Sequence, residues 1–238
     1  MKMFLTSSPF LESNGNMNRA NGFRRRLVCA SRGCKRGLFV ASDPTNHERN
    51  VMHLTAFVSM LESGGIVLDC FEILDDQTRE QTESLVRSSD FIILSGGHVP
   101  TQNAFFEEIG LRDALSGFDG VILAISAGSM NSATTVYAQP EEPGEAVDPL
   151  YQRFLTGLGL TDINILPHYQ AVKDELLDGL RLYEDIAFSD SMGKHFYVMP
   201  DGSYLYRDNR RQTIYGECYL IQDGMMEKMC EKGHRISV

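Results

Sequence analysis

The chain has 238 residues, of which 42% are hydrophobic and 23% charged. This composition suits a single α/β domain with a substantial core, and we predict one domain over residues 1–238. The formal net charge of −10 argues against nucleic acid as a partner, because phosphate backbones favour concentrated Lys and Arg. The one basic cluster, Arg24 to Arg26, is explained more simply as part of a solvated loop.

The cysteines predict neither a metal site nor a disulfide framework. They are odd in number and scattered, and no two have the Cys-x-x-Cys spacing. We accordingly expect reduced thiols, no metal and no cofactor. The N-terminal residues turn polar too early for a signal peptide, and no stretch approaches the length of a transmembrane helix. These features predict a cytoplasmic protein that does not bind membranes.

The first half of the chain alternates between strand and helix patterns. Residues 10–26 lack periodicity and are predicted to form a surface loop, and residues 27–30 a strand extension or an insertion. Alternation of this kind predicts a mainly parallel sheet covered on both faces, with ligands at the carboxyl ends of its strands. Strands are predicted at 3–6, 37–42, 66–74, 91–95 and 121–125, and helices at 50–63, 76–88, 101–109 (with Thr101 as N-cap) and 111–116.

The second half of the chain departs from this alternation. Residues 139–150 form an acidic, Pro-containing segment that we expect to flank the site as a loop. A strand at 159–166 and a helix at 175–188 follow. The remainder predicts a C-terminal antiparallel β appendage with short strands at 195–199, 203–207 and 212–221.

The strongest functional signal is the run from Val121 to Ile125, which stops at Ser126 and continues in small residues. This pattern predicts a strand, a sharp turn and a helix, with the Ser126 hydroxyl exposed above the sheet. The N–H of Ala127 and the helix N-terminus would face the same point and hold an oxyanion. The usual pattern is Gly-x-Ser-x-Gly, and Ala124 occupies its first position here. Small residues also occur wherever a helix starts against a strand, so this turn alone leaves the role of Ser126 open.

A serine nucleophile needs a base and a group that orients the base. Of the six histidines, His168 follows Leu166-Pro167 at a predicted strand end, where the site of a parallel sheet is expected. The acid remains open between Asp201, in the turn Pro-Asp-Gly, and the acidic loop. The candidates in that loop are Glu141, Glu142 and Asp148.

Several segments together resemble the peptidase E family of serine peptidases, the aspartyl dipeptidases, which are relatives of cyanophycinase. The resemblance covers nearly the whole chain and implies a three-layer fold like that of class I glutamine amidotransferases. It implies Ser126 as nucleophile and His168 as base, with N–H groups of Gly97 and Ala127 forming the oxyanion hole. The segments are Ile-Leu-Ser-Gly-Gly-His (93–98), Ala-Ile-Ser-Ala-Gly-Ser (124–129), Leu-Pro-His-Tyr (166–169), Met-Pro-Asp-Gly (199–202) and Glu-Lys-Gly-His-Arg (231–235).

Two positions depart from the family pattern. Asp201 stands where these dipeptidases usually carry Glu, and their substrate-binding Arg, in a Gly-Glu-Thr-Arg stretch, has no counterpart. Lys173 or the cluster from Arg24 to Arg26 would have to replace that Arg. We expect further substrate contacts from Gly96 and His98. The sequence thus predicts a dipeptidase or exopeptidase that acts on small peptides and is not confined to N-terminal aspartate; the alternative is a non-catalytic binding or regulatory protein that retains the fold.

Overall fold

A large mixed β-sheet forms the centre of the fold in the computed structural model, which describes residues 1–10, 15–209 and 211–238. Its strand order is β16-β13-β12-β1-β5-β4-β2-β3. The parallel part consists of β1 (Lys2–Thr6), β5 (Val121–Ile125), β4 (Phe91–Leu94), β2 (Arg36–Val40) and β3 (Cys70–Leu74). The antiparallel strands β12 (Tyr204–Asp208), β13 (Arg211–Tyr215) and β16 (Arg235–Ser237) extend it beyond β1. The predicted α/β class with a mainly parallel sheet is confirmed.

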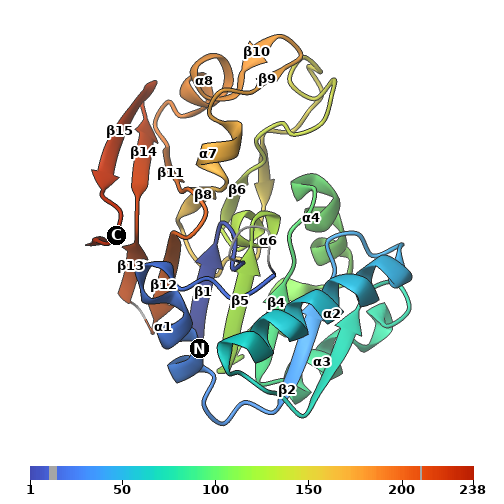
Figure 1. Cartoon of the computed structure of the whole chain (residues 1–238). Helices are drawn as coiled ribbons and strands as arrows, with labels where there is room; N and C mark the ends of the chain where they lie inside the picture. The colour runs from blue at the N-terminus through green and yellow to red at the C-terminus, as the bar shows by residue number, and fades with distance from the viewer. Residues whose placement is uncertain (11–14, 210) are drawn as a thin grey trace.

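Helices cover both faces of this sheet (Figure 1). Phe4 and Leu123 pack with α1 and α2 on one face, whereas Leu5 and Ile122 pack with α3 and α4 on the other. Burial on both faces explains the unbroken apolar runs of the central strands. No helix within the described residues is both long and apolar enough to cross a membrane. The helices are α1 (Phe23–Ala30), α2 (His47–Gly64), α3 (Thr82–Ser88, preceded by the 3₁₀ turn η3, Arg79–Gln81), α4 (Val99–Glu108) and α5 (Leu111–Ala114).

The N-terminal segment differs from its prediction. Residues predicted as loop and strand extension form the 3₁₀ turn η2 (Ala20–Gly22) and helix α1. Three apolar residues at helical spacing, Phe23, Leu27 and Ala30, are buried, but the intervening arginines obscure this short pattern in the sequence. Residues 11–14 of the predicted loop lie outside the described residues. Helix α4 also begins earlier than predicted, because Pro100 is tolerated in its first turn and His98, not Thr101, is the N-cap.

A second sheet lies beside the first, in the order β15-β14-β11-β8. The C-terminal strands are mainly antiparallel, as predicted, and they divide between the two sheets. The predicted strand at 212–221 is in fact two strands, β13 and β14, which belong to different sheets. The second sheet consists of β8 (Asn164–Leu166), β11 (His195–Val198), β14 (Cys218–Gln222) and β15 (Met225–Cys230), and the short strands β6 (Thr135–Tyr137) and β7 (Phe154–Thr156) pair separately.

The helix predicted at 175–188 is wrong in its first half. Residues there form a hairpin of β9 (Leu176–Leu177) and β10 (Leu180–Arg181), followed by a π-helical segment, η4 (Leu182–Ala187), and α8 (Phe188–Asp190). Asp178 and Gly179 both have positive φ, 53° and 83°, which is the conformation of a tight two-residue hairpin turn. The apolar spacing was compatible with a helix, but this turn and its contacts to the acidic loop override it.

The close packing of β4 against the residues after β5 gives a stability prediction. A Cβ at Gly128 would lie 2.4 Å from the Leu94 carbonyl oxygen, so Gly128→Ala forces a backbone shift. We expect the free energy of unfolding to fall by about 3 kcal/mol, measured by denaturant titration. Gly117→Ala is the control, because its Cβ meets no atom within 4 Å and only the positive φ is penalised, by about 1 kcal/mol. Equal losses in the two variants would contradict the packing argument.

Candidate active site

Ser126 occupies a strained turn between β5 and helix α6 (Ala127–Asn131). Its φ of 48° and ψ of −113° place the side chain at the carboxyl edge of the sheet, as in a nucleophile elbow. The Ser126 N–H donates to the Thr6 carbonyl oxygen at 3.0 Å, and the Ser129 hydroxyl donates to the same oxygen at 2.9 Å. The turn is therefore anchored to the end of β1.

His168 reaches Ser126 from the second sheet. It is separated from the end of β8 by Pro167 alone, has a positive φ of 58° and precedes the short helix α7 (Tyr169–Val172). The His168 Nε2 lies 3.0 Å from the Ser126 Oγ, within hydrogen-bond distance. The His168 backbone N–H donates to the Ser7 Oγ at 2.7 Å. The structure thus brings together the two residues that the sequence singled out first.

Asp201 lies on the other side of the imidazole. Its Oδ1 is 2.8 Å from the His168 Nδ1 and also accepts a short hydrogen bond from the Ser7 hydroxyl. The Asp201 N–H donates to the Gln170 side chain at 2.8 Å, which holds the turn against α7 and lets the shorter acid reach the histidine. Burial alone would raise the pKa of the Asp201 carboxyl, but the hydrogen bonds from His168 and Ser7 outweigh it and hold the pKa below its ordinary value.

The glycines after β4 lie beside Ser126. The pairing of Leu94 with Ala124 puts Gly96 level with the serine, and a Cβ at Gly96 would lie 3.3 Å from the Ser126 Cβ. Gly97 is packed against Ser42: a Cβ at position 97 would lie 2.4 Å from the Ser42 Oγ. Close packing at the edge where Ser126 stands therefore excludes a Cβ at Gly97 unless Ser42 shifts, and leaves little room for one at Gly96. Whether Gly97 and Ala127 donate to an oxyanion stays a prediction.

The other predicted substrate contacts have protein partners of their own. His98 is held between Thr101 and Glu145, each 2.8 Å from one of its ring nitrogens. Lys173 is exposed and lies 3.8 Å from the Asp174 carboxylate. Arg24 donates to the Gly64 carbonyl oxygen, and the Arg26 guanidinium lies 3.8 Å from the centre of the Tyr215 ring. None of these side chains lines the cleft at Ser126 within the described part of the chain, and their contact with substrate stays a prediction.

A cleft of about 240 Å³ opens at Ser126 and His168. We call it the Ser126 cleft. No Lys or Arg lines it among the described residues, and two carboxylates do. Its walls are formed by Glu141, Glu175, the apolar side chains of Met130, Val172, Leu176, Leu177 and Leu182, and Gln139, Pro140 and Pro167.

Glu141 belongs to the acidic loop that the sequence predicted beside the site. The residue as a whole is exposed, but the protein atoms around its carboxyl group desolvate it and raise its pKa to about 7, against the opposing effects of His98 and the Val99 N–H. The neighbouring Glu145 carboxylate also raises this pKa, and His168 lowers it. A carboxyl group in the field of the candidate base can change charge near neutral pH.

Ser7 and Gln170 are site residues that the sequence analysis did not single out. Ser7 follows β1, so the rule that places ligands at strand carboxyl ends also applied to it. Its contacts to both His168 and Asp201 come from a long-range approach of the two sheets that no local pattern encodes. The sequence predicts Glu141 only as an alternative to Asp201 as the acid, and in the structure it is Asp201 that lies beside the His168 ring.

One group of side chains within the described residues has the spacing of metal ligands. His98, Glu142 and Glu145 bring ligand atoms within 4.8 Å of one another. The Glu145 carboxylate already accepts hydrogen bonds from the N–H groups of Glu141 and Glu142 and lies against His98. These bonds account for its position, and we assign no metal to the group.

A serine, a histidine and a carboxylate bonded in this order at a strand-to-helix turn are typical of serine hydrolases. Residues 4–214 match the family model of peptidase family S51, and the chain belongs to this family of serine-type peptidases. The predicted relation to peptidase E is confirmed.

Solved structures agree on the fold. A peptidase from an acI-B1 Actinobacterium has a TM-score of 0.69 at 15% identity, with 100% of this chain and 96% of that chain covered. A protein assigned to peptidase E from Listeria monocytogenes EGD-e has a TM-score of 0.59 at 16% identity, with 96% and 98% covered. A search of curated proteins found no match.

The depressed pKa of Asp201 predicts how stability depends on pH. An unfolded Asp has a pKa of about 3.9, so the folded chain binds fewer protons at this site just below that value. The contribution of Asp201 is therefore complete above about pH 4 and is lost as pH falls through the lower folded pKa. We expect wild type to exceed Asp201→Asn in Tm at pH 6, with the difference shrinking below pH 4. A difference that does not change with pH would contradict this.

Proposed function

We propose that this protein is a cytoplasmic serine peptidase that hydrolyses short peptides as a dipeptidase or exopeptidase, with Ser126, His168 and Asp201 as its triad. One observation carries the proposal: the His168 ring lies 3.0 Å from the Ser126 Oγ through Nε2 and 2.8 Å from Asp201 through Nδ1. In this arrangement one nitrogen can accept the serine proton while the other stays protonated toward the carboxylate.

The acylation step follows from these positions. His168 Nε2 takes the proton of Ser126 as Oγ attacks the peptide carbonyl carbon, and the carbonyl electron pair moves to oxygen. The N–H groups of Gly97 and Ala127 stabilise that oxyanion. The imidazolium gives its proton to the leaving amine as the C–N bond breaks. The charge of Asp201, which its hydrogen bonds keep ionised, stabilises the imidazolium in between.

Deacylation follows the same chemical steps, with a water molecule as the nucleophile in place of Ser126. His168 takes a proton from a water molecule that attacks the acyl carbon, and returns it to Ser126 as the ester bond breaks. Ser7 supports both steps indirectly, because its hydroxyl bonds to Asp201 and its oxygen accepts the His168 N–H. The two bonds fix the separation between acid and base.

The size of the Ser126 cleft supports a short substrate. Its volume is about 240 Å³, and residues 139–141, 176 and 177 line it. The 139–150 loop and the β9–β10 hairpin that carry them extend beyond the carboxyl edge of the large sheet (Figure 1). The Gly144 and Ala146 N–H groups donate to the Asp178 carboxylate, which joins the loop to the hairpin turn. This joined wall favours small peptides over extended chains.

The pairing of nucleophile and base predicts non-additive kinetics. Ser126→Ala and His168→Ala should each reduce kcat/KM by several orders of magnitude on a dipeptide panel, and the double variant should be hardly worse than either. A fluorophosphonate probe should label wild type and not Ser126→Ala. Additive losses would contradict the pairing. Absence of both labelling and hydrolysis would instead favour the non-catalytic binding protein that retains the fold.

The charge of the cleft predicts the substrate range. No Lys or Arg lines the cleft among the described residues. We therefore expect kcat/KM for Asp-Leu to exceed that for Ala-Leu or Asn-Leu by less than about 100-fold, because a fully formed buried ion pair with the aspartate would give a larger ratio. Lys173→Met should leave these ratios unchanged, and Arg25→Met serves as a matched charge control. A larger preference for Asp-Leu that disappears in Lys173→Met would overturn this prediction and make Lys173 the replacement anchor.

A further inference from the structure

We propose that the Ser126 cleft binds an apolar side chain, and that the enzyme prefers peptides in which the residue under attack is apolar, such as leucine. The inference rests on the proposed peptidase activity and assigns a substrate class to the same cleft. Five of the side chains that line the cleft are apolar. We call this set the apolar wall; its members are Met130, Val172, Leu176, Leu177 and Leu182.

The apolar wall lies in the same cleft as the atoms that react, since Ser126 and His168 also line it. In a peptide, the side chain of the residue under attack begins two covalent bonds from the carbonyl carbon. A substrate with this carbon at Ser126 therefore places that side chain in the cleft or at its edge. The cleft volume of about 240 Å³ is below the range of about 300–1,000 Å³ that holds drug-sized ligands, and it suits one side chain with its backbone.

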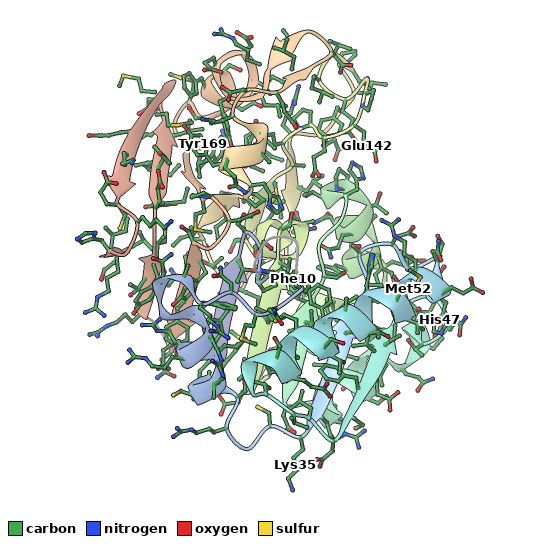
Figure 2. All side chains as sticks on the ribbon, in the orientation of Figure 1. Phe10, Lys35, His47, Met52, Glu142 and Tyr169 are labelled. Carbon is green, nitrogen blue, oxygen red and sulfur yellow. The ribbon has the colours of Figure 1, made fainter. Side chains whose placement is uncertain are left out.

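A small cluster of buried side chains supports the apolar wall. Three members of the wall belong to this cluster, which joins α7, the β9–β10 hairpin and the 139–150 loop. Helix α7, whose first residue Tyr169 is labelled in Figure 2, lies below the hairpin in this view. An apolar surface that is fixed before substrate binds requires little ordering on binding. The cluster consists of Ala146, Leu182 and Ile186, with Val172, Leu177 and Leu180 packed against it.

Leu176 is the member of the apolar wall with the most surface open to a ligand. It is 66% exposed, whereas Met130 and Leu182 are 5% and 7% exposed. An apolar side chain that covers Leu176 removes apolar surface of both partners from water, and this burial favours binding. Because Leu176 is exposed in the free protein, its substitution tests the wall with little effect on the core.

Charged side chains suit the cleft less well. No Lys or Arg lines it among the described residues, so an acidic side chain would find no opposite charge there. A basic side chain would meet Glu175, which is exposed and therefore contributes little as an ion-pair partner. It would also meet Glu141, whose pKa of about 7 leaves it only partly ionised at neutral pH. Burial of a charge against the apolar wall is unfavourable, and an apolar side chain avoids that cost.

The first test compares wild type with Leu176→Ala on the dipeptides Leu-Ala and Ala-Ala. In wild type we expect kcat/KM for Leu-Ala to exceed that for Ala-Ala by at least about 30-fold, because one methylene in an apolar pocket already changes this ratio by about 10-fold or more. In Leu176→Ala the ratio should fall by at least about 5-fold. Leu150→Ala is the matched control and should keep the wild-type ratio, since Leu150 is 84% exposed and does not line the cleft.

Leu176→Arg tests the same position with a charge. We expect kcat/KM for Asp-Ala relative to Ala-Ala to rise by at least about 10-fold over wild type, because the guanidinium pairs with an aspartate side chain in the cleft. The preference for Leu-Ala should fall at the same time. Leu150→Arg adds the same charge outside the cleft and should change the Asp-Ala ratio by less than about 2-fold, since salt screens distant exposed charges.

A binding measurement separates this inference from the proposed function. In Ser126→Ala protein, calorimetry should give a Kd for Leu-Ala at least about 10-fold lower than that for Ala-Ala, and adding Leu176→Ala should reduce the difference. If wild type neither hydrolyses peptides nor is labelled by the fluorophosphonate probe, the proposed activity fails, and the binding series still decides the role of the apolar wall. Equal affinities for the two peptides, or a higher kcat/KM for Lys-Ala or Asp-Ala than for Leu-Ala in wild type, would overturn the inference.

Discussion

The level alignment of β1, β5 and β4 is the constraint on which the site depends. Because Thr6 pairs with Ile125 and Leu94 with Ala124, the residues that follow these strands meet at one edge. Ser126 adopts its strained turn there only because Thr6 accepts two hydrogen bonds and Gly128 lets the Leu94 carbonyl approach. Backbone strain of this kind costs on the order of 1–3 kcal/mol and persists only when the surroundings over-determine it.

The sequence predicted the parts of the molecule that repeat a local rule. Continuous apolar strands followed by amphipathic helices identified the parallel sheet, and the rule about strand ends identified Ser126 and His168. Asp201 remained one of several acids, because a Pro-Asp-Gly turn is explained equally well by turn chemistry. The 2.8 Å contact between the Asp201 carboxylate and the His168 Nδ1 distinguishes it from the acids of the loop, and this contact appears only in the folded structure. The prediction of one domain over 1–238 stays a prediction.

The errors in the prediction have a common physical origin. Helix α1 and the β9–β10 hairpin are short, and short elements depend on tertiary contacts more than on propensity. Asp178 illustrates this: its positive φ and its bonds to the Gly144 and Ala146 N–H groups exist only when the acidic loop is folded beside it. The contacts of Ser7 and the raised pKa of Glu141 likewise appear only after the two sheets and the loop have been brought together.

The nucleophile and the base of the proposed triad come from different sheets. Ser126 belongs to the large sheet, whereas His168 follows β8 of the second sheet and Asp201 lies where the chain crosses from β11 back to β12. The 3.0 Å separation of Oγ and Nε2 is therefore set by how the sheets dock, and not by the geometry of either one. If the proposed triad acts as described, turnover reports on that docking. A displacement of about 1 Å between the sheets would lower the rate by about 100-fold while every strand and helix remained intact.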